Sequence, residues 1–199
     1  MRCLSNSYLG YFSFLPLSDG VFYKIIKEKL MRVFILIALS FLLTVSVLAQ
    51  PNKPTKPLAE TFSATSLDGQ TFDLAELKGK VVVLSFWSTR CAICHSEIPK
   101  LNQLVETYKN KDVVFLGLTM ENPSKVEAFL KKRTFDFKIL PNSFGVVLKY
   151  ADKSVDGSIS MGFPAHYLIN QKGEIELKTS GFDKSVMLNS RINELLNAR

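Results

Sequence analysis

The chain has 199 residues, of which 47% are hydrophobic and 22% charged, with three cysteines and a formal net charge of +7. From Gln50 onward, 20 lysines and arginines face 16 acidic residues, so the excess falls to +4 and forms no basic stripe. We therefore expect no nucleic-acid partner, and the part after Ala49 is long enough for a single domain with one hydrophobic core.

The first predicted element is an apolar stretch at residues 33–48 (VFILIALSFLLTVSVL), which follows three lysines and Arg32. A basic region, an apolar core and a small residue at Ala49 are the parts of a secretory signal, and the run is shorter than the roughly 20 residues that span a bilayer. We expect residues 1–49 to be a signal peptide or else an uncleaved N-terminal anchor, with residues 1–30 preceding its natural start.

Export would place the rest of the chain outside the cytoplasm, in the periplasm or secreted, where disulfides form and persist. Contact with the membrane would come only through residues 33–48, if they stay attached. Three prolines and two lysines then make residues 50–60 read as an extended, solvated linker. A domain over residues 61–199 follows, and it opens with a predicted hairpin from Phe62 to Leu77 that turns at Leu67–Gln70.

The most informative motif is Cys91-Ala92-Ile93-Cys94, which follows the apolar strand Val81–Phe86 and begins a helix. A thiolate at a helix N-terminus is stabilised by free N–H groups and the helix dipole, which makes it a nucleophile near neutral pH. We expect Cys91 to be that nucleophile and Cys94, one turn further in, to be the resolving thiol. Because Cys3 lies in the N-terminal segment, only this pair remains, too few for a disulfide framework. His95 and His166 could complete a Cys2His2 zinc site with the pair, but three of the four ligands would crowd into one helical turn.

Two other readings of the motif stay open. With His95, the motif is also C-x-x-C-H, a c-type haem attachment site in which His95 and a methionine (Met120, Met161 or Met187) would be the axial ligands. A peroxiredoxin-like peroxide reductase has P-x-x-x-[ST]-x-x-C; Ser88 fits that pattern, but Leu84 stands at the proline position. A dithiol exchanger, in contrast, needs no cofactor.

The rest of the chain alternates predicted strands and helices, which favours an α/β domain with helices around a mixed sheet. A helix from Cys91 to Tyr108 should be broken or kinked at Pro99. The other predicted elements are the strand Val113–Leu118, a helix from Ser124, a short helix Phe144–Tyr150, the strands His166–Ile169 and Glu174–Thr179, and a final helix Asp183–Leu196.

Over Leu58–Leu196 the chain resembles the exported TlpA/ResA-like thiol–disulfide oxidoreductases of the thioredoxin-like superfamily. The resemblance rests on LDGQTFDLAELKGKVVVLSFW, the cysteine pair, Pro99, GFPAHYLINQKGEIE and Gly181. It implies a thioredoxin-like fold with an N-terminal hairpin and a central insertion between Cys94 and Pro164. It also implies a cis peptide bond at Pro164, which faces the cysteine pair.

The resemblance further implies disulfide exchange on exported proteins, in the reducing direction, with electrons from a membrane thiol donor. Cytochrome c maturation and general disulfide reduction both fit. Glu97 matches the acidic residue of C-x-x-C-x-x-E, which relays a proton to or from the resolving thiol in that family; a carboxylate there can also simply stabilise the helix end.

The chain departs from the family's pattern around the cysteines. Arg90 stands where tryptophan is usual, Ile93 where proline is usual, His95 follows the second cysteine, and Ser85 replaces the buried acid of thioredoxin itself. Residues beside the cysteines help to set thiolate stability and thus the reduction potential, so these departures bear on redox poise rather than on fold.

Four residues are expected to form the substrate-binding surface: Trp87 beneath the active site, Arg90 beside Cys91, and Phe163 with Pro164, whose backbone pairs with substrate in thioredoxin-like folds. His166, two residues beyond Pro164, is interpreted as a hydrogen-bonded strand histidine rather than a catalytic one.

Overall fold

The computed structural model describes residues 19–48 and 56–198, and the chain divides into two compact units at Pro54. The described part of the first unit is one helix, α1 (Asp19–Leu48). Among the described residues, no helix combines the length and apolar character needed to cross a membrane. The predicted early start and the first part of the linker fall on residues 1–18 and 49–55, outside the described residues.

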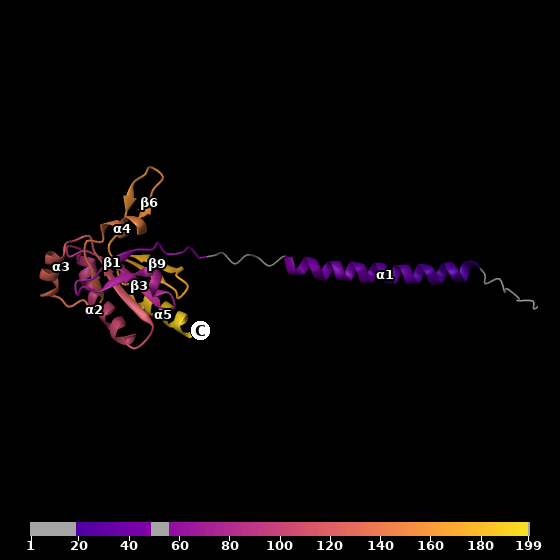
Figure 1. The fold of residues 1–199 in the computed structure, drawn as a ribbon, viewed down its shortest axis with the longest axis horizontal. Helices are drawn as coiled ribbons and strands as arrows, with labels where there is room; N and C mark the ends of the chain where they lie inside the picture. Colours follow the sequence, from indigo (N-terminus) through magenta and orange to yellow (C-terminus); the bar gives the residue numbers. More distant parts are fainter. Residues whose placement is uncertain (1–18, 49–55, 199) are drawn as a thin grey trace, which may run out of the picture. The chain divides into compact units, whose positions relative to one another are not determined.

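The second unit is built around a mixed five-stranded sheet in the order β5-β4-β3-β8-β9 (Figure 1). Its central strand β3 is buried along its whole length, as a continuous apolar run predicts for a strand covered on both faces. β4 and β5 run parallel to β3 and to each other, whereas β8 is antiparallel to β3 and β9 is antiparallel to β8. The strands are β3 (Val81–Phe86), β4 (Val113–Leu118), β5 (Lys138–Leu140), β8 (Ala165–Ile169) and β9 (Ile175–Ser180).

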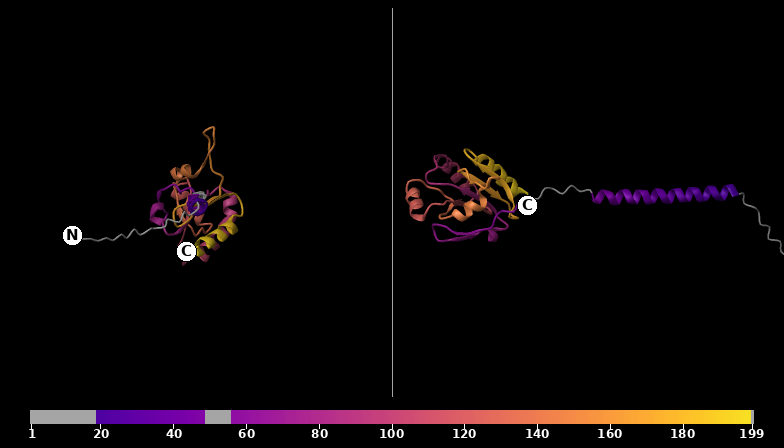
Figure 2. Two further views of the ribbon diagram at one scale, coloured as in Figure 1. Left: turned by 90° about the vertical axis from the view of Figure 1, so that its right-hand side faces the viewer. Right: turned by 90° about the horizontal axis from the view of Figure 1, so that it is seen from above.

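Alternate residues of these strands build two cores, one on each face of the sheet (Figures 1 and 2). Val83 on β3 and Leu168 on β8 belong to the first core, together with residues of three helices. Leu84 and Tyr167, their neighbours along the chain, belong to the second core. The helices of the first face are α2 (Ala92–Thr107), α3 (Pro123–Leu130) and α5 (Ser185–Asn197).

The second face is covered by α4 (Phe144–Tyr150) and an N-terminal hairpin, β1 (Ser63–Thr65) with β2 (Thr71–Asp73). The sequence predicted α4 with the correct ends. The predicted hairpin is shorter than expected, because its last residues form a 3-10 helix, η1 (Leu74–Leu77). The carboxylate of Asp73 accepts the Ala75 N–H at 2.8 Å and so begins this helix.

α2 continues through Pro99, so the helix is not broken there, and the expected alternative of a kink stays a prediction. Its inner face, including Ile98 and Leu101 on either side, is buried in the first core, and tertiary packing outweighs the lost backbone hydrogen bond. Residues 56–60, the end of the expected linker, are mostly exposed but are also attached to the sheet. Leu58 forms an isolated antiparallel bridge with Glu174, and the Ile175 N–H donates to the Pro57 carbonyl at 2.8 Å.

The insertion between Cys94 and Pro164 also contains a short hairpin, β6 (Asp152–Lys153) with β7 (Ile159–Ser160). It projects away from the sheet beyond α4 (Figures 1 and 2). The polar segment around Gly157 forms its turn, where the Ser154 N–H donates to the Ser158 carbonyl at 2.9 Å.

Candidate active site at the Cys91–Cys94 disulfide

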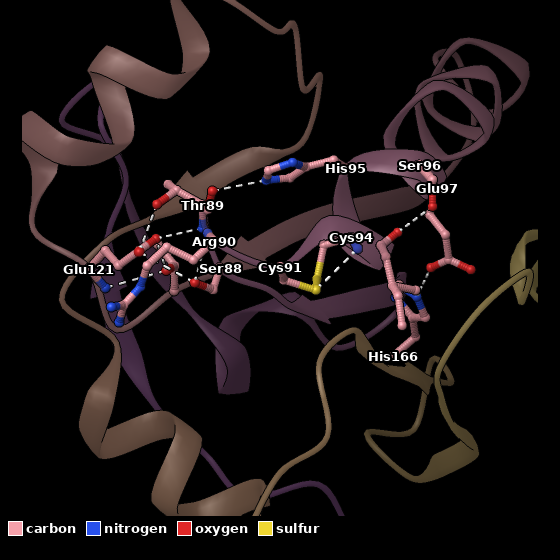
Figure 3. The surroundings of a disulfide bond; sticks show 12 residues. Ser88, Thr89, Arg90, Cys91, Cys94, His95, Ser96, Glu97, Glu121 and His166 are labelled. Carbon is pink, nitrogen blue, oxygen red and sulfur yellow. Dashed lines mark hydrogen bonds and ion pairs between the residues drawn. A yellow bond between two sulfur atoms is a disulfide. The ribbon is translucent and has the colours of Figure 1, made fainter.

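The two cysteines lie where β3 gives way to α2, and they are joined by a disulfide bond with Cα atoms 5.2 Å apart (Figure 3). Cys91 is the N-cap residue of α2, and its Sγ accepts the Cys94 N–H at 3.1 Å. Cys91 is half-buried, whereas Cys94 is 3% exposed. The first sulfur therefore receives the charge-stabilising contacts of a helix N-terminus, and the second is shielded from solvent.

The loop before Cys91 is held by a carboxylate that the sequence analysis missed. Glu121 Oε2 accepts the Thr89 N–H at 2.7 Å, and Oε1 accepts the Thr89 hydroxyl at 2.7 Å and the Ser88 hydroxyl at 3.3 Å. Burial alone would raise the pKa of Glu121, but Lys125 and the Thr89 hydrogen bonds lower that pKa to about 2. Glu121 follows β4 and the loop follows β3, and the carboxyl ends of adjacent parallel strands meet at one edge of a sheet. This rule could have indicated from the sequence that Glu121 lies near the loop before Cys91.

Glu97 is fully buried, and both oxygens of its carboxylate are committed to partners other than the cysteines. Oε2 lies 3.1 Å from His166 Nε2, and Oε1 accepts the Lys184 N–H at 3.0 Å. Burial favours the neutral acid, but the hydrogen bonds from His166 and Lys184 outweigh it and hold the pKa of Glu97 below its usual value. Glu97 thus favours its ionised form, and its part in proton transfer to or from Cys94 stays a prediction.

His166 makes the hydrogen bond that the sequence interpretation assigned to it, and its partner is Glu97. Figure 3 shows these two residues together on one side of the disulfide, with Thr89 and Glu121 on the other. The pairing joins α2 to β8 across 69 residues of sequence, which is why spacing alone gave no sign of it.

The residues expected to bind substrate have different environments. The Phe163–Pro164 bond is cis, as the resemblance implied; Phe163 is half-buried and Arg90 is exposed. Trp87 is 1% exposed and packs against Phe129 and Phe135, each with its ring centroid 5.3 Å away. Its side chain is part of the core, so any contribution of Trp87 to substrate binding comes from beneath the site, and that role stays a prediction.

His95 does not lie as a haem ligand would. Its Nε2 donates to the Thr89 carbonyl at 2.9 Å, and its ring packs on Phe129 with the centroids 4.8 Å apart. Both sulfurs of the motif are engaged in the disulfide. These residues do not fit attachment of a haem. For the peroxidase reading, the position that needs proline is Leu84, which lies inside β3 and is fully buried.

A disulfide at the N-terminus of a helix that follows the central strand, opposite a cis-proline strand of a mixed sheet, defines a thioredoxin-like thiol–disulfide exchanger. The chain belongs to the AhpC/TSA family, whose model matches residues 56–178, and within the thioredoxin-like proteins it is ResA-like. The predicted family, fold class and enzyme class are thereby confirmed.

Three relatives support this placement. The chain is 35% identical over 125 residues to "Thiol-disulfide oxidoreductase ResA" of a Bacillus cereus strain, a match that covers 62% of this chain and 68% of that protein. It is 34% identical over 121 residues to "Thioredoxin-like protein YneN" of Bacillus subtilis, 59% of this chain and 66% of that protein. A putative thiol:disulfide interchange protein DsbE from Chlorobium tepidum shares the fold, with a TM-score of 0.61, 24% identity, and 71% and 96% of the two chains covered.

Proposed function

We propose that this protein reduces disulfides of exported proteins, with Cys91 as the nucleophile and Cys94 as the resolving thiol. The observation that carries the assignment is the asymmetry of the pair. Cys91 is accessible and its sulfur caps a helix, whereas Cys94 is 3% exposed. A substrate disulfide can therefore approach the first sulfur and not the second.

The exchange has two steps. The Cys91 thiolate attacks one sulfur of the substrate disulfide, which forms a mixed disulfide and releases the other substrate sulfur as a thiolate. Cys94 then loses its proton and attacks Cys91 Sγ, which forms the Cys91–Cys94 bond seen here and releases the second substrate sulfur. The substrate gains two electrons, and the cysteine pair loses them.

The reducing direction is supported by the charge around the pair. A dithiol oxidant is strong when its reduced form is stabilised as a thiolate. Here an ionised carboxylate, Glu97, lies one helical turn from Cys94, disfavours negative charge on that sulfur, and opposes the stabilisation that the helix N-terminus gives to the Cys91 thiolate. We expect a reduction potential below about −200 mV rather than near the roughly −120 mV of a strong dithiol oxidant.

Substrate docking is assigned to the backbone of Phe163, next to Pro164. Within residues 56–198, no backbone hydrogen bond uses the N–H or carbonyl of Phe163, whereas the Pro164 carbonyl accepts the Gly181 N–H at 2.9 Å. The free groups of Phe163 suit an extended substrate segment, and Arg90 adds an exposed positive charge beside Cys91.

We further propose an extracytoplasmic location, with residues 1–49 as the signal or anchor and a membrane thiol donor that returns electrons to the pair. The relatives' names fit exchange of this kind but do not specify a substrate. Cytochrome c maturation and general disulfide reduction are both compatible with one exposed dithiol.

Alkylation and trapping test the assignment. In the reduced protein at neutral pH, iodoacetamide should modify Cys91 first. Cys94→Ala should trap a mixed disulfide with insulin or another disulfide-containing protein, and Cys91→Ala should neither trap nor reduce. Preferential alkylation of Cys94 would reverse the roles. Consumption of peroxide at a rate matching insulin reduction would instead favour the peroxidase reading.

A further inference from the structure

A row of buried polar side chains crosses the sheet on the face that α2 covers. Ser85 on β3 is paired in register with His166 on β8, which is paired with Thr179 on β9. Cross-strand partners carry their side chains on the same face, with Cβ atoms about 4.5–5.5 Å apart. Val83 and Leu168, two residues along from Ser85 and His166, belong to the core beneath α2 and α5, so the row also faces these helices.

Each residue of the row has one buried polar atom that makes no hydrogen bond within the described part of the chain. These atoms are Ser85 Oγ, His166 Nδ1 and Thr179 Oγ1. An unpaired buried polar group destabilises the fold, and three adjacent ones call for a shared explanation. A buried water typically makes about three hydrogen bonds to such groups, and this row offers that number.

The imidazole of His166 has a defined orientation. Glu97 is the ionised partner, so its Oε2 accepts and His166 Nε2 must carry the proton that is donated. In the neutral ring, Nδ1 then holds the bare lone pair. A base whose second nitrogen is oriented by a carboxylate is the arrangement that activates a nucleophile in many enzymes.

Cys94 is the group in this core that must lose a proton. It lies three residues before Glu97 on the same inward face of α2, and its burial separates it from bulk water. Both oxygens of Glu97 already accept a hydrogen bond from another group, so a second buried base beside it is a candidate to accept the proton of the resolving thiol.

We propose that His166 Nδ1, through a water bound between Ser85 and Thr179, accepts the proton of Cys94 as Cys94 attacks the mixed disulfide. This inference rests on the proposed function. The S–H bond of Cys94 breaks and an N–H bond forms at Nδ1; the new thiolate displaces the substrate sulfur from Cys91, and the imidazolium later returns its proton to solvent. Glu97 is the positioning residue that fixes the ring.

Among the described residues, few charged groups lie near His166. From α2 it contacts Glu97, and its register partners on β3 and β9 are Ser85 and Thr179, which carry uncharged hydroxyls. The loop before α5 contributes the Lys184 N–H to Glu97. At the surface of that loop, Asp183 is paired with Lys100 at 2.6 Å. A change in the pH profile on mutation of His166 would therefore be assigned to the Glu97–His166–Cys94 set.

The test separates the two chemical steps with a symmetrical chromogenic aryl disulfide. The reduced protein releases one coloured thiolate when Cys91 attacks and a second when Cys94 resolves. His166→Gln keeps a donor for Glu97 but lacks a titratable nitrogen, and His95→Gln is the matched control, because the chain has only two histidines. We expect His166→Gln to slow the second phase roughly 10²-fold, a typical acid–base contribution, and to flatten its pH profile, with the first phase unchanged.

The outcomes are distinct. Two phases in His166→Gln that match the unmodified protein at every pH overturn the role of His166, as does an equal slowing of both phases. Absence of both phases in the unmodified protein refutes the proposed function itself. In His95→Gln, which loses a hydrogen bond to the loop before Cys91, any change should affect both phases alike; a selective slowing of the second phase would overturn the assignment to His166.

Two measurements do not depend on activity. In His95→Gln the imidazole nitrogen NMR spectrum reports His166 alone, and it should show the proton on Nε2 in the neutral ring; a proton on Nδ1 overturns the proposal. Thr179→Val removes one hydroxyl of the row. If the hydroxyl binds a water, the variant should melt at a lower temperature than the unmodified protein; a higher melting temperature would mean that the hydroxyl was unpaired and would remove the water from the proposed route.

Discussion

Glu121, just beyond the end of β4, accepts the backbone N–H of Thr89 at 2.7 Å and so fixes the loop that leads from β3 into Cys91. Its other oxygen accepts the Thr89 hydroxyl, and Lys125 lies 2.8 Å away as a counter-charge. The position of the nucleophilic sulfur therefore depends on a carboxylate far along the chain, on the neighbouring parallel strand.

We predict that Glu121→Gln destabilises the protein by about 2 kcal/mol at neutral pH, because an amide cannot accept hydrogen bonds at both ends. The pKa of Glu121 is lowered to about 2 from 4.5, so its stabilisation is present above pH 4.5 and is lost as pH falls toward 2. Urea unfolding at about pH 7 and pH 3 should show the variant and the unmodified protein converging at the lower pH. Glu127→Gln, at an exposed position on α3, is the control; a constant gap between the curves would contradict the prediction.

Gly117 on β4 is predicted to tolerate no side chain. A Cβ there would lie 2.7 Å from Ile139 Cδ1 and 3.3 Å from Trp87 Nε1. Overpacking of this kind typically costs about 1–3 kcal/mol, so Gly117→Ala should lower the melting temperature. Gly145→Ala is the matched control, because Gly145 is exposed in α4 with nothing within 4 Å of its Cβ position, and it should gain about 0.4–1 kcal/mol. Equal melting temperatures for the two variants would show that Ile139 moves aside at no cost.

The sequence predicted those helices and strands that are determined by the hydrophobic pattern of neighbouring residues. The apolar runs of β3 and β4 and the short helix α4 have the ends that were expected. The cysteine pair was placed at the correct strand-to-helix junction for the same reason, since an apolar run followed by C-x-x-C is a local signal. At Pro99 the sequence left both a break and a kink open, and the continuity of α2 depends on burial of the residues beside it.

The parts that could not be predicted join distant segments. Glu97 was recognised as a candidate, but its partner His166 lies on β8, and only the strand register brings Ser85 and Thr179 beside that histidine. The end of the predicted linker was missed for a related reason. Its composition is that of a solvated segment, and its attachment depends on a buried acid on β9 that no neighbouring residue reveals.

Arg90 is predicted to speed attack on anionic disulfides through its charge. It is exposed, adjacent to Cys91, and its N–H donates to Ser88 Oγ at 3.2 Å. An interaction of about 0.5–1 kcal/mol between such charges in water corresponds to roughly a 2- to 5-fold loss of rate in Arg90→Gln at low salt. Screening should erase the difference at about 1 M salt. Arg133→Gln, beyond α3, should show no loss; a loss in Arg90→Gln that is independent of salt would contradict a role for charge.

Glu176 on β9 connects the start of the folded unit to its last helix. Its carboxylate is 1% exposed and is paired with Lys56 at 2.6 Å and with Arg191 on α5. Burial alone would raise the pKa of Glu176, but the two cations lower it below its usual value. Residues 56–58 are thus tied to the sheet through a charge that would be costly if left unpaired.

We predict that the two cations compensate for one another, so that their removal is not additive. Lys56 and Arg191 are each more than a third exposed, so Lys56→Met or Arg191→Met alone should cost only about 1 kcal/mol or less. The double variant leaves a buried carboxylate without a cation, and breaking a buried pair in this way costs about 3–5 kcal/mol.

The free energy of unfolding should depend on pH in opposite directions in the unmodified protein and the double variant. In the unmodified protein the stabilisation is lost as pH falls, whereas in the double variant the carboxylate is a liability that protonation relieves, so the two unfolding curves should approach one another in acid. Urea unfolding of all four proteins at about pH 7 and pH 4 gives the coupling energy directly. Lys109→Met is the control, because Lys109 and Glu106 form an exposed pair and its loss should change little. Additive costs that do not vary with pH would mean that Glu176 is solvated and that residues 56–58 are held by their backbone hydrogen bonds alone.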